Sequence, residues 1–234
     1  MKKSFIAICT AVVVGFVWAV ALCVQALNGA QAVSAFDESM RIVVDAGHGG
    51  IDGGVTGRTT GAKESEINLA IAYKLSAVLQ EMGFDVVMTR KTDAGLYDTT
   101  AKGFKKRDMQ KRKEIILAAE PTMVISVHQN YYPSRTQRGA QVFYFASNEQ
   151  SARLATQIQA QMNKCYESER VKNRVAAQGD FFILHCAACP SVIVECGFLS
   201  NAKDEALLLS KAWQEKTARG IAAGVAAYLS SGSA

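Results

Sequence analysis

The chain begins with a long apolar segment. In residues 5–24 the only polar side chain is that of Thr10, and Lys2 and Lys3 are followed by no charged residue until Asp37. Twenty helical residues span about 30 Å, which is the thickness of the hydrocarbon core of a bilayer. The basic residues before the segment predict that its N-terminal end stays in the cytoplasm.

Two interpretations of this segment remain open. It is either an uncleaved membrane anchor or a secretory signal peptide, since Ala30-Gln31-Ala32 has the small-x-small form of a cleavage site. Both interpretations place the rest of the chain outside the cytoplasmic membrane. We therefore expect residues 1–36 to be an anchor or signal segment and residues 37–234 to form one domain.

After this segment, apolar runs of strand length alternate with stretches of helical periodicity. The Ile67, Ile71, Leu75, Val78 and Met82 side chains, for example, recur every three or four residues, as on one face of a helix. Such alternation predicts a single α/β domain, with a twisted, mostly parallel sheet of about six strands flanked by helices. Strands are expected near 42–44, 84–89, 123–127, 141–146, 181–184 and 192–194, and helices near 67–82, 107–119, 154–165 and 201–229.

Composition and charge narrow the classes of function. A hydrophobic content of 49% with only three prolines excludes a disordered or collagen-like chain. The net charge of +5 falls to +3 when Lys2 and Lys3 are set aside, which is too little for nucleic-acid binding to be expected. A basic cluster in and just before the predicted second helix is either a solvated helix face or a surface that attracts anionic wall polymers or lipid head groups. Its members are Lys102, Lys105, Lys106, Arg107, Lys111, Arg112 and Lys113.

The six cysteines do not form one disulfide framework. Cys9 and Cys23 lie in the apolar segment, and the other four lie in the domain. Cys186-Ala187-Ala188-Cys189 is a C-x-x-C sequence that is compatible with two reduced thiols, a disulfide or metal binding. A redox motif is disfavoured because Pro190 and a buried strand follow, rather than a helix.

Four polar residues are candidates for chemistry. His48, His128 and Glu195 each follow a predicted buried strand, and Glu64 begins the first helix. The carboxyl ends of the strands form the ligand crevice in open α/β sheets, so these side chains are expected at one edge. Two histidines and a carboxylate are a common catalytic zinc set, and a second carboxylate can act as general base and acid. The alternative is that each is an ordinary hydrogen-bonded residue at a strand end.

Four motifs, in order, resemble those of one family. The first motif of the zinc-dependent N-acetylmuramoyl-L-alanine amidases of the Amidase_3 type is similar to VDAGHGGIDGG (44–54). Their second, third and fourth motifs resemble ESEINL (64–69), SVHQN (126–130) and PSVIVECGFLSN (190–201). The resemblance extends over about residues 40–230.

The resemblance assigns roles to the candidates. It implies one zinc ion held by His48, Glu64 and His128, with Glu195 as the catalytic carboxylate. It also implies hydrolysis of the amide between the lactyl group of N-acetylmuramic acid and L-alanine of the peptidoglycan stem peptide. Glu66 is a rival ligand, but helical geometry turns it about 200° away from Glu64. The alternative is an inactive, membrane-anchored peptidoglycan-binding or regulatory protein on the same fold.

Further resemblance points to one branch of the family. The sequences CGFLSN (196–201) and RDMQKR (107–112) resemble those of the sporulation-linked, CwlD-like amidases. This implies removal of stem peptides in the spore cortex before muramic-δ-lactam forms, although a vegetative cell-wall amidase has nearly the same motifs. The segment between 146 and 181 is too short for the extra helix that plugs the zinc site in some relatives. We therefore expect control by anchoring or by a regulatory protein partner.

Overall fold

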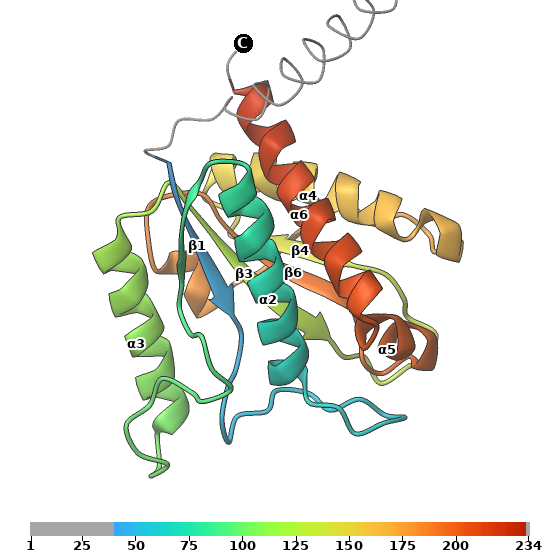
Figure 1. Cartoon of the computed structure of the whole chain (residues 1–234), viewed down its shortest axis with the longest axis horizontal. Coiled ribbons are helices and arrows are strands. Elements are labelled where there is room, and N and C mark those ends of the chain that lie inside the picture. The colour runs from blue at the N-terminus through green and yellow to red at the C-terminus, as the bar shows by residue number, and fades with distance from the viewer. Residues whose placement is uncertain (1–39, 233–234) are drawn as a thin grey trace, which may run out of the picture. The chain divides into compact units, whose positions relative to one another are not determined.

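A single six-stranded sheet forms the centre of the computed structural model, which describes residues 40–232 (Figure 1). The strand order is β2-β1-β3-β6-β4-β5. Strands β2, β1, β3 and β6 are parallel, β4 is antiparallel to β6, and β5 is parallel to β4. The bounds are Arg41–Ala46 for β1, Asp85–Met88 for β2, Met123–Asn130 for β3, Gln141–Tyr144 for β4, Ala177–Gln178 for β5 and Ser191–Phe198 for β6. The predicted mostly parallel α/β sheet is confirmed.

Helices cover both faces of the sheet. Figure 1 shows α2 (Glu64–Glu81) and α6 (Lys211–Ser231) side by side across one face, and α4 (Glu149–Cys165) packs against α6. The other face is covered by α3 (Phe104–Ala119) and the 3₁₀ helix η2 (Phe182–His185). Two short helices, η1 (Glu167–Glu169) and α5 (Ala202–Leu208), complete the described fold. Because both faces are covered, the central strands are apolar along most of their length.

The face under α3 becomes polar toward the carboxyl ends of its strands. Strand register pairs Asp45 of β1 with Ser126 of β3, and Ser126 with Ile193 of β6. Two residues further on, His128 pairs with Glu195. Since alternate residues share a face, these side chains all lie on the α3 side, with the polar ones toward the carboxyl ends.

Two predicted elements are wrong. Residues 181–184 do not form the predicted strand: Phe181 is the N-cap of the 3₁₀ turn η2, residues 182–184 belong to that turn, and the short strand β5 lies a few residues earlier. The burial pattern gives the reason: Phe181 and Phe182 are exposed whereas Ile183 and Leu184 are buried, so the run does not alternate as a strand does. The helix expected over 201–229 is two helices, because α5 ends at Leu208 and Ser210 is the N-cap of α6.

Other predicted boundaries are close to the observed ones. Helix α3 begins at Phe104 rather than at Arg107, and β4 ends at Tyr144 rather than near 146. Asn201 caps α5 by accepting hydrogen bonds from the backbone N–H groups of Lys203 and Asp204.

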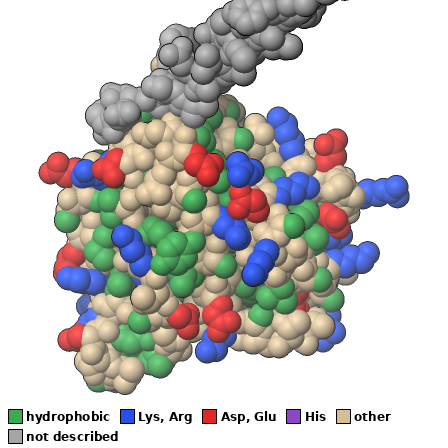
Figure 2. Space-filling view, viewed as in Figure 1, with side chains coloured by type: hydrophobic (Ala, Val, Ile, Leu, Met, Phe, Trp, Pro, Cys, Tyr) green, Lys and Arg blue, Asp and Glu red, His purple; other side chains and the backbone are tan. Residues whose placement is uncertain are grey.

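The anchor or signal segment predicted at residues 1–36 lies outside the described residues, so the domain boundary near residue 37 stays a prediction. Within residues 40–232, no helix is both long enough and apolar enough to span a bilayer. Figure 2 shows basic and acidic side chains interspersed over the face that carries α2 and α6. That face therefore has no single-sign patch of the kind that binds nucleic acid.

Candidate metal centre and active site

A glycine-rich turn after β1 presents His48. The backbone of His48 is left-handed, with φ of 60°, and Gly49 and Gly50 continue with φ of 144° and 63°. A Cβ atom at Gly47 would overlap the imidazole ring of His128. Glycine at this position therefore lets the end of β1 approach the end of β3 closely enough for the two histidines to meet.

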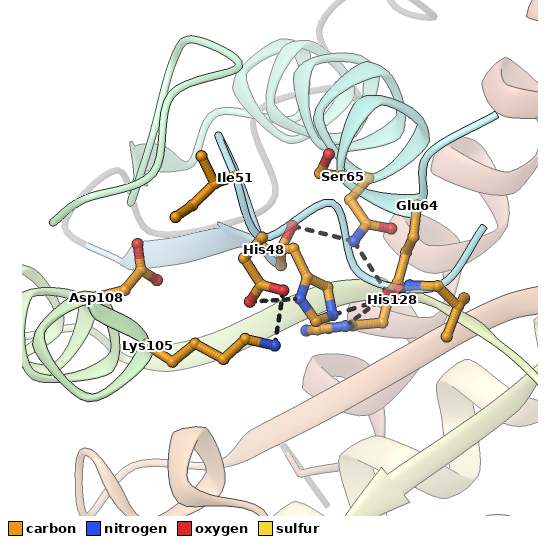
Figure 3. Close-up of polar contacts among 12 residues, drawn as sticks. His48, Ile51, Glu64, Ser65, Lys105, Asp108 and His128 are labelled. Carbon is orange, nitrogen blue, oxygen red and sulfur yellow. Dashed lines mark hydrogen bonds and ion pairs between the residues drawn. The ribbon is translucent and has the colours of Figure 1, made fainter. Parts of the chain in front are cut away.

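Glu64 lies between the two histidines. Its Oε1 is 2.9 Å from His128 Nδ1, and its Oε2 is 3.4 Å from His48 Nε2. One ligand atom from each of the three residues lies within 4.8 Å of the other two, and Figure 3 shows the side chains converging. The structure thus brings together the three residues that the sequence predicted as metal ligands.

Glu66, the rival candidate, points away from this group. Its side chain is 55% exposed and lies 4.0 Å from Lys63. Glu64, by contrast, is almost completely buried. This difference agrees with the expected rotation of about 200° between the two positions on a helix.

Hydrogen bonds hold the Glu64 carboxylate in place. Oε1 accepts from the backbone N–H of Gln129 at 3.1 Å and from Asn68 Nδ2 at 3.3 Å, and Oε2 accepts from the Val55 N–H at 2.9 Å. Asn68 also donates to the carbonyl of Gly47 at 3.1 Å, which ties α2 to the glycine-rich turn. These contacts fix the orientation of the carboxylate toward the histidines.

His48 is oriented by an acidic partner. Its Nδ1 is 3.1 Å from Asp52 Oδ2, which leaves Nε2 facing Glu64. Lys105, reaching in from α3, places Nζ 2.9 Å from the other oxygen of Asp52 (Figure 3). A carboxylate on the far nitrogen of a histidine is a frequent arrangement around metal-ligating histidines.

The three residues shift one another's pKa values. Burial lowers the pKa of His48, but Glu64 and Asp52 outweigh it and raise the pKa to about 9. Burial raises the pKa of Glu64, but His128 and His48 outweigh it and hold that pKa well below its usual range. A carboxylate and two imidazoles that converge in this way form a donor set that zinc accepts.

Glu195 has an unusual environment for a carboxyl group. Its Oε2 is buried and has no hydrogen-bond partner among the described residues. Burial raises the pKa of Glu195 to about 7, although His128 acts in the opposite direction. A buried oxygen without a partner, on the strand next to His128, is free to exchange a proton with a bound molecule.

A family model for the N-acetylmuramoyl-L-alanine amidases, Amidase_3, matches residues 42–227. The chain belongs to this amidase family. It is 32% identical to the germination-specific N-acetylmuramoyl-L-alanine amidase of Bacillus subtilis over 191 residues, which cover 80% of this chain and 78% of that relative.

Solved structures agree with this assignment. The CwlD amidase from Clostridioides difficile, in complex with the GerS lipoprotein, is 36% identical and superposes with a TM-score of 0.78, covering 82% of this chain and 99% of that one. The catalytic domain of the CwlV amidase from Bacillus (Paenibacillus) polymyxa is 29% identical, with a TM-score of 0.71 and coverage of 82% and 98%.

The amidase also contains a buried ionic network that the sequence analysis missed. Arg112 is 1% exposed, and its Nη1 lies 2.5 Å from Asp45 while its Nε lies 2.6 Å from Asp108. The interpretation of the basic cluster as a solvated helix face is therefore wrong for Arg112, although Lys105 and Lys111 are exposed. The spacing of four between Asp108 and Arg112 was the available signal.

This network holds the turn that carries His48. Arg112 Nη2 donates to the carbonyl of His48 at 2.5 Å, and Arg90 Nη2 donates to the carbonyl of Gly47 at 3.0 Å. Both guanidinium groups also donate to the carbonyl of Ala46, at 2.8 Å each. The two arginines thus bind three consecutive carbonyl groups, at the end of β1 and in the glycine-rich turn. We call Arg90 and Arg112 the arginine clamp.

The four cysteines of the domain are free thiols. Cys186 lies in the turn at the end of η2, where its Sγ contacts the carbonyl of Phe182 at 3.5 Å. This agrees with the reduced interpretation of the C-x-x-C sequence rather than with a disulfide. His185, the third histidine, pairs with Asp180 at 2.7 Å and takes no part in the group around Glu64.

A cavity of about 320 Å³ opens between α3 and η2 beside the histidines. His48 and His128 line it, with side chains 26% and 20% exposed. Phe181 and Phe182 line it as well, and the sequence analysis missed them because it assigned them to a strand. The cavity therefore exposes the two histidines on this side.

Proposed function

We propose that His48, Glu64 and His128 hold one zinc ion and that Glu195 is the catalytic carboxylate of this amidase. The bond hydrolysed is the amide between the lactyl group of N-acetylmuramic acid and L-alanine of the stem peptide. The observation that carries the proposal is the convergence of three potential ligand atoms within 4.8 Å of one another, close to a buried carboxyl oxygen without a partner.

Glu195 moves the proton in this reaction. A zinc ion, when bound, supplies a Lewis acid that polarises the amide carbonyl and lowers the pKa of water. Glu195 accepts a proton as water adds to the carbonyl carbon, and it returns a proton to the nitrogen as the C–N bond breaks. The products are the lactyl carboxylate and a stem peptide with a free L-alanine amino group. A pKa of about 7 suits a group that must both accept and donate a proton.

Asp52 and the turn residues prepare the site. Asp52 keeps Nε2 of His48 directed inward, and the arginine clamp fixes the backbone of His48. Such supporting contacts typically change metal affinity by 10–100-fold when removed.

The biological setting is proposed from the relatives. The similarity to the germination-specific amidase and to the CwlD amidase supports a role in spore cortex maturation, where muramic-δ-lactam is formed. A vegetative cell-wall role is the alternative. The CwlD amidase was solved with a lipoprotein, which supports a regulatory protein partner for this amidase too. We further propose that residues 1–36 place the domain outside the cytoplasmic membrane, as an anchor or as a cleaved signal.

The test is digestion of purified muropeptides followed by mass spectrometry. We expect free stem peptides with an L-alanine amino terminus, loss of the activity on chelation, and its return with added zinc. Intact muropeptides in the presence of bound zinc would overturn the proposal in favour of an inactive binding or regulatory protein.

A further inference from the structure

Two adjacent aromatic rings form part of the cavity beside the metal centre. Phe181 and Phe182 are 42% and 48% exposed and both line the cavity. The next two residues, Ile183 and Leu184, are buried, and Ile183 also lines the cavity. Ile183 and Leu184 therefore anchor the 3₁₀ turn η2 in the core, and the two exposed rings lie at its start.

The Phe181 ring is held in place by contacts within the protein. Phe181 packs edge to face against Phe143 of β4, with 5.5 Å between ring centroids. A Cβ atom at Gly179 would overlap the Phe181 ring, so glycine at that position makes room for it. The Leu184 N–H donates to the Phe181 carbonyl at 3.0 Å and closes the turn. Because these contacts already restrain Phe181, less ordering of its side chain is needed when a ligand packs against it.

A surface of different chemistry lies on the other side of Glu195. A second cavity, of about 620 Å³, is lined by Gln141 together with four cationic side chains: Arg138, Arg170, Lys172 and Arg174. Gln141 is the first residue of β4 and pairs with Glu195 in the sheet. Arg170 and Lys172 form no ion pair within residues 40–232, so their charges remain available to a ligand.

The substrate has the same asymmetry around its scissile amide. On the acyl side lies an uncharged pyranose ring, and on the amine side lies a stem peptide that carries carboxylates. Aromatic faces attract the weakly positive C–H edges of a neighbouring group, and guanidinium groups pair with carboxylates. We propose that Phe181 and Phe182 form the subsite for the N-acetylmuramoyl ring and that the stem peptide runs toward the cationic cavity. This inference rests on the proposed function and specifies how the substrate is oriented in the same site.

Two substrates that differ only in the sugar test the subsite. One is a muramoyl peptide, and the other is a D-lactoyl peptide that has the same amide and stem but no pyranose ring. For Phe182→Ala we expect the ratio of kcat/KM for the muramoyl over the lactoyl peptide to fall about tenfold, the size expected for one lost aromatic contact. Phe182→Tyr, which keeps the ring, retains the ratio. Leu117→Ala removes a 50% exposed apolar side chain of α3 outside the cavity lining and also retains it.

An equal loss on both substrates, or a larger loss on the lactoyl peptide, overturns the sugar subsite. Failure of the wild type to cleave either compound overturns the proposed function instead. In that case the subsite is tested by binding. Calorimetry measures the affinity of both compounds for the Glu195→Gln variant and for the double variant that also carries Phe182→Ala. An affinity loss confined to the muramoyl peptide supports the subsite, and an equal loss for both contradicts it.

Discussion

Gly54 shows how narrowly the backbone constrains the candidate ligands. Its φ is +69°, and a Cβ atom there would lie 2.8 Å from His48 Cδ2 and would overlap the Glu64 carboxylate. Gly61 has a similar φ of +75° but nothing within 4 Å of a Cβ. A substitution at either glycine therefore strains the backbone. Only a substitution at Gly54 also collides with the candidate ligands.

We predict that Gly54→Ala lowers zinc affinity at least tenfold, because Glu64 and His48 must move to admit the methyl group. Gly61→Ala should keep wild-type zinc affinity and lose about 1 kcal/mol of stability from strain alone. Competition with a chromophoric chelator measures the affinity, and urea unfolding measures the stability. Equal zinc affinity in both variants would contradict the placement of the metal next to Gly54.

Glu195 and His48 have different proposed roles, and matched substitutions separate them. Glu195→Gln should retain the metal and lower kcat at least 100-fold, since an amide cannot carry the proton. His48→Ala should lose the metal itself, because one of three ligands is removed. Elemental analysis of dialysed protein and a muropeptide assay give the two readouts. Equal metal content in the wild type and His48→Ala would refute the ligand assignment.

The four candidate residues could be predicted from the sequence because each begins a helix or lies at or near the carboxyl end of a buried strand, within a recognisable motif. The residues that orient these four could not be predicted from the sequence. Asp52 reaches His48 only through the left-handed turn at His48 to Gly50, and Lys105 reaches Asp52 from another element. No sequence periodicity encodes such contacts, because they depend on how a turn and a distant helix are placed in space.

At the scale of elements, α3 and β1 are joined by a buried ion pair whose strength depends on pH. Burial raises the pKa of Asp45, but the Arg112 guanidinium and the Ser126 and Thr89 hydroxyl groups outweigh it and lower the pKa to about 2. Because the folded-state pKa lies below the unfolded value of 3.8, ionised Asp45 stabilises the fold above pH 4. That contribution is lost as the pH falls toward 2.

We predict that wild type exceeds Asp45→Asn in stability by a constant margin between pH 7 and pH 4. The margin should shrink by about 2 kcal/mol as the pH falls from 4 toward 2. Urea unfolding at a series of pH values measures it, and Asp98→Asn, at an exposed carboxylate, is the control. A margin that does not change below pH 4 would show that Arg112 does not stabilise the Asp45 charge in the folded state.

The elements themselves were predictable where their periodicity was unambiguous. The buried strands β1, β3 and β6 and the amphipathic helix α2 lie close to their expected positions. The 3₁₀ turn at 182–185 could not be predicted, since the four consecutive apolar residues 181–184 fit a strand and a 3₁₀ turn equally well. Only the packing of Ile183 and Leu184 under α3 selects the turn, and that packing is a long-range property.

At the scale of the whole molecule, strand order assembles the site. The last described strand, β6, inserts between β3 and β4, so Glu195 lies beside His128 although a helix and four shorter elements separate them in the sequence. The switch from parallel to antiparallel pairing occurs at β6. The strand order itself reverses between β1 and β3, and ligand crevices in open α/β sheets form outside the carboxyl ends of the strands at such a switch point, where His48 and His128 lie.

We predict that the fragment 37–234, supplied with zinc, cleaves purified peptidoglycan without any partner. All four candidate residues belong to this fragment, and the His48 and His128 side chains remain 26% and 20% exposed. Release of L-alanine amino groups measures the activity, and the same fragment with Glu195→Gln is the control. A fragment that binds zinc but becomes active only when a lipoprotein partner is added would contradict this prediction, because it would show that the partner is needed to complete the active site. Activity of the fragment alone would instead mean that anchoring and a partner control the location and timing of hydrolysis, not the chemistry of the site.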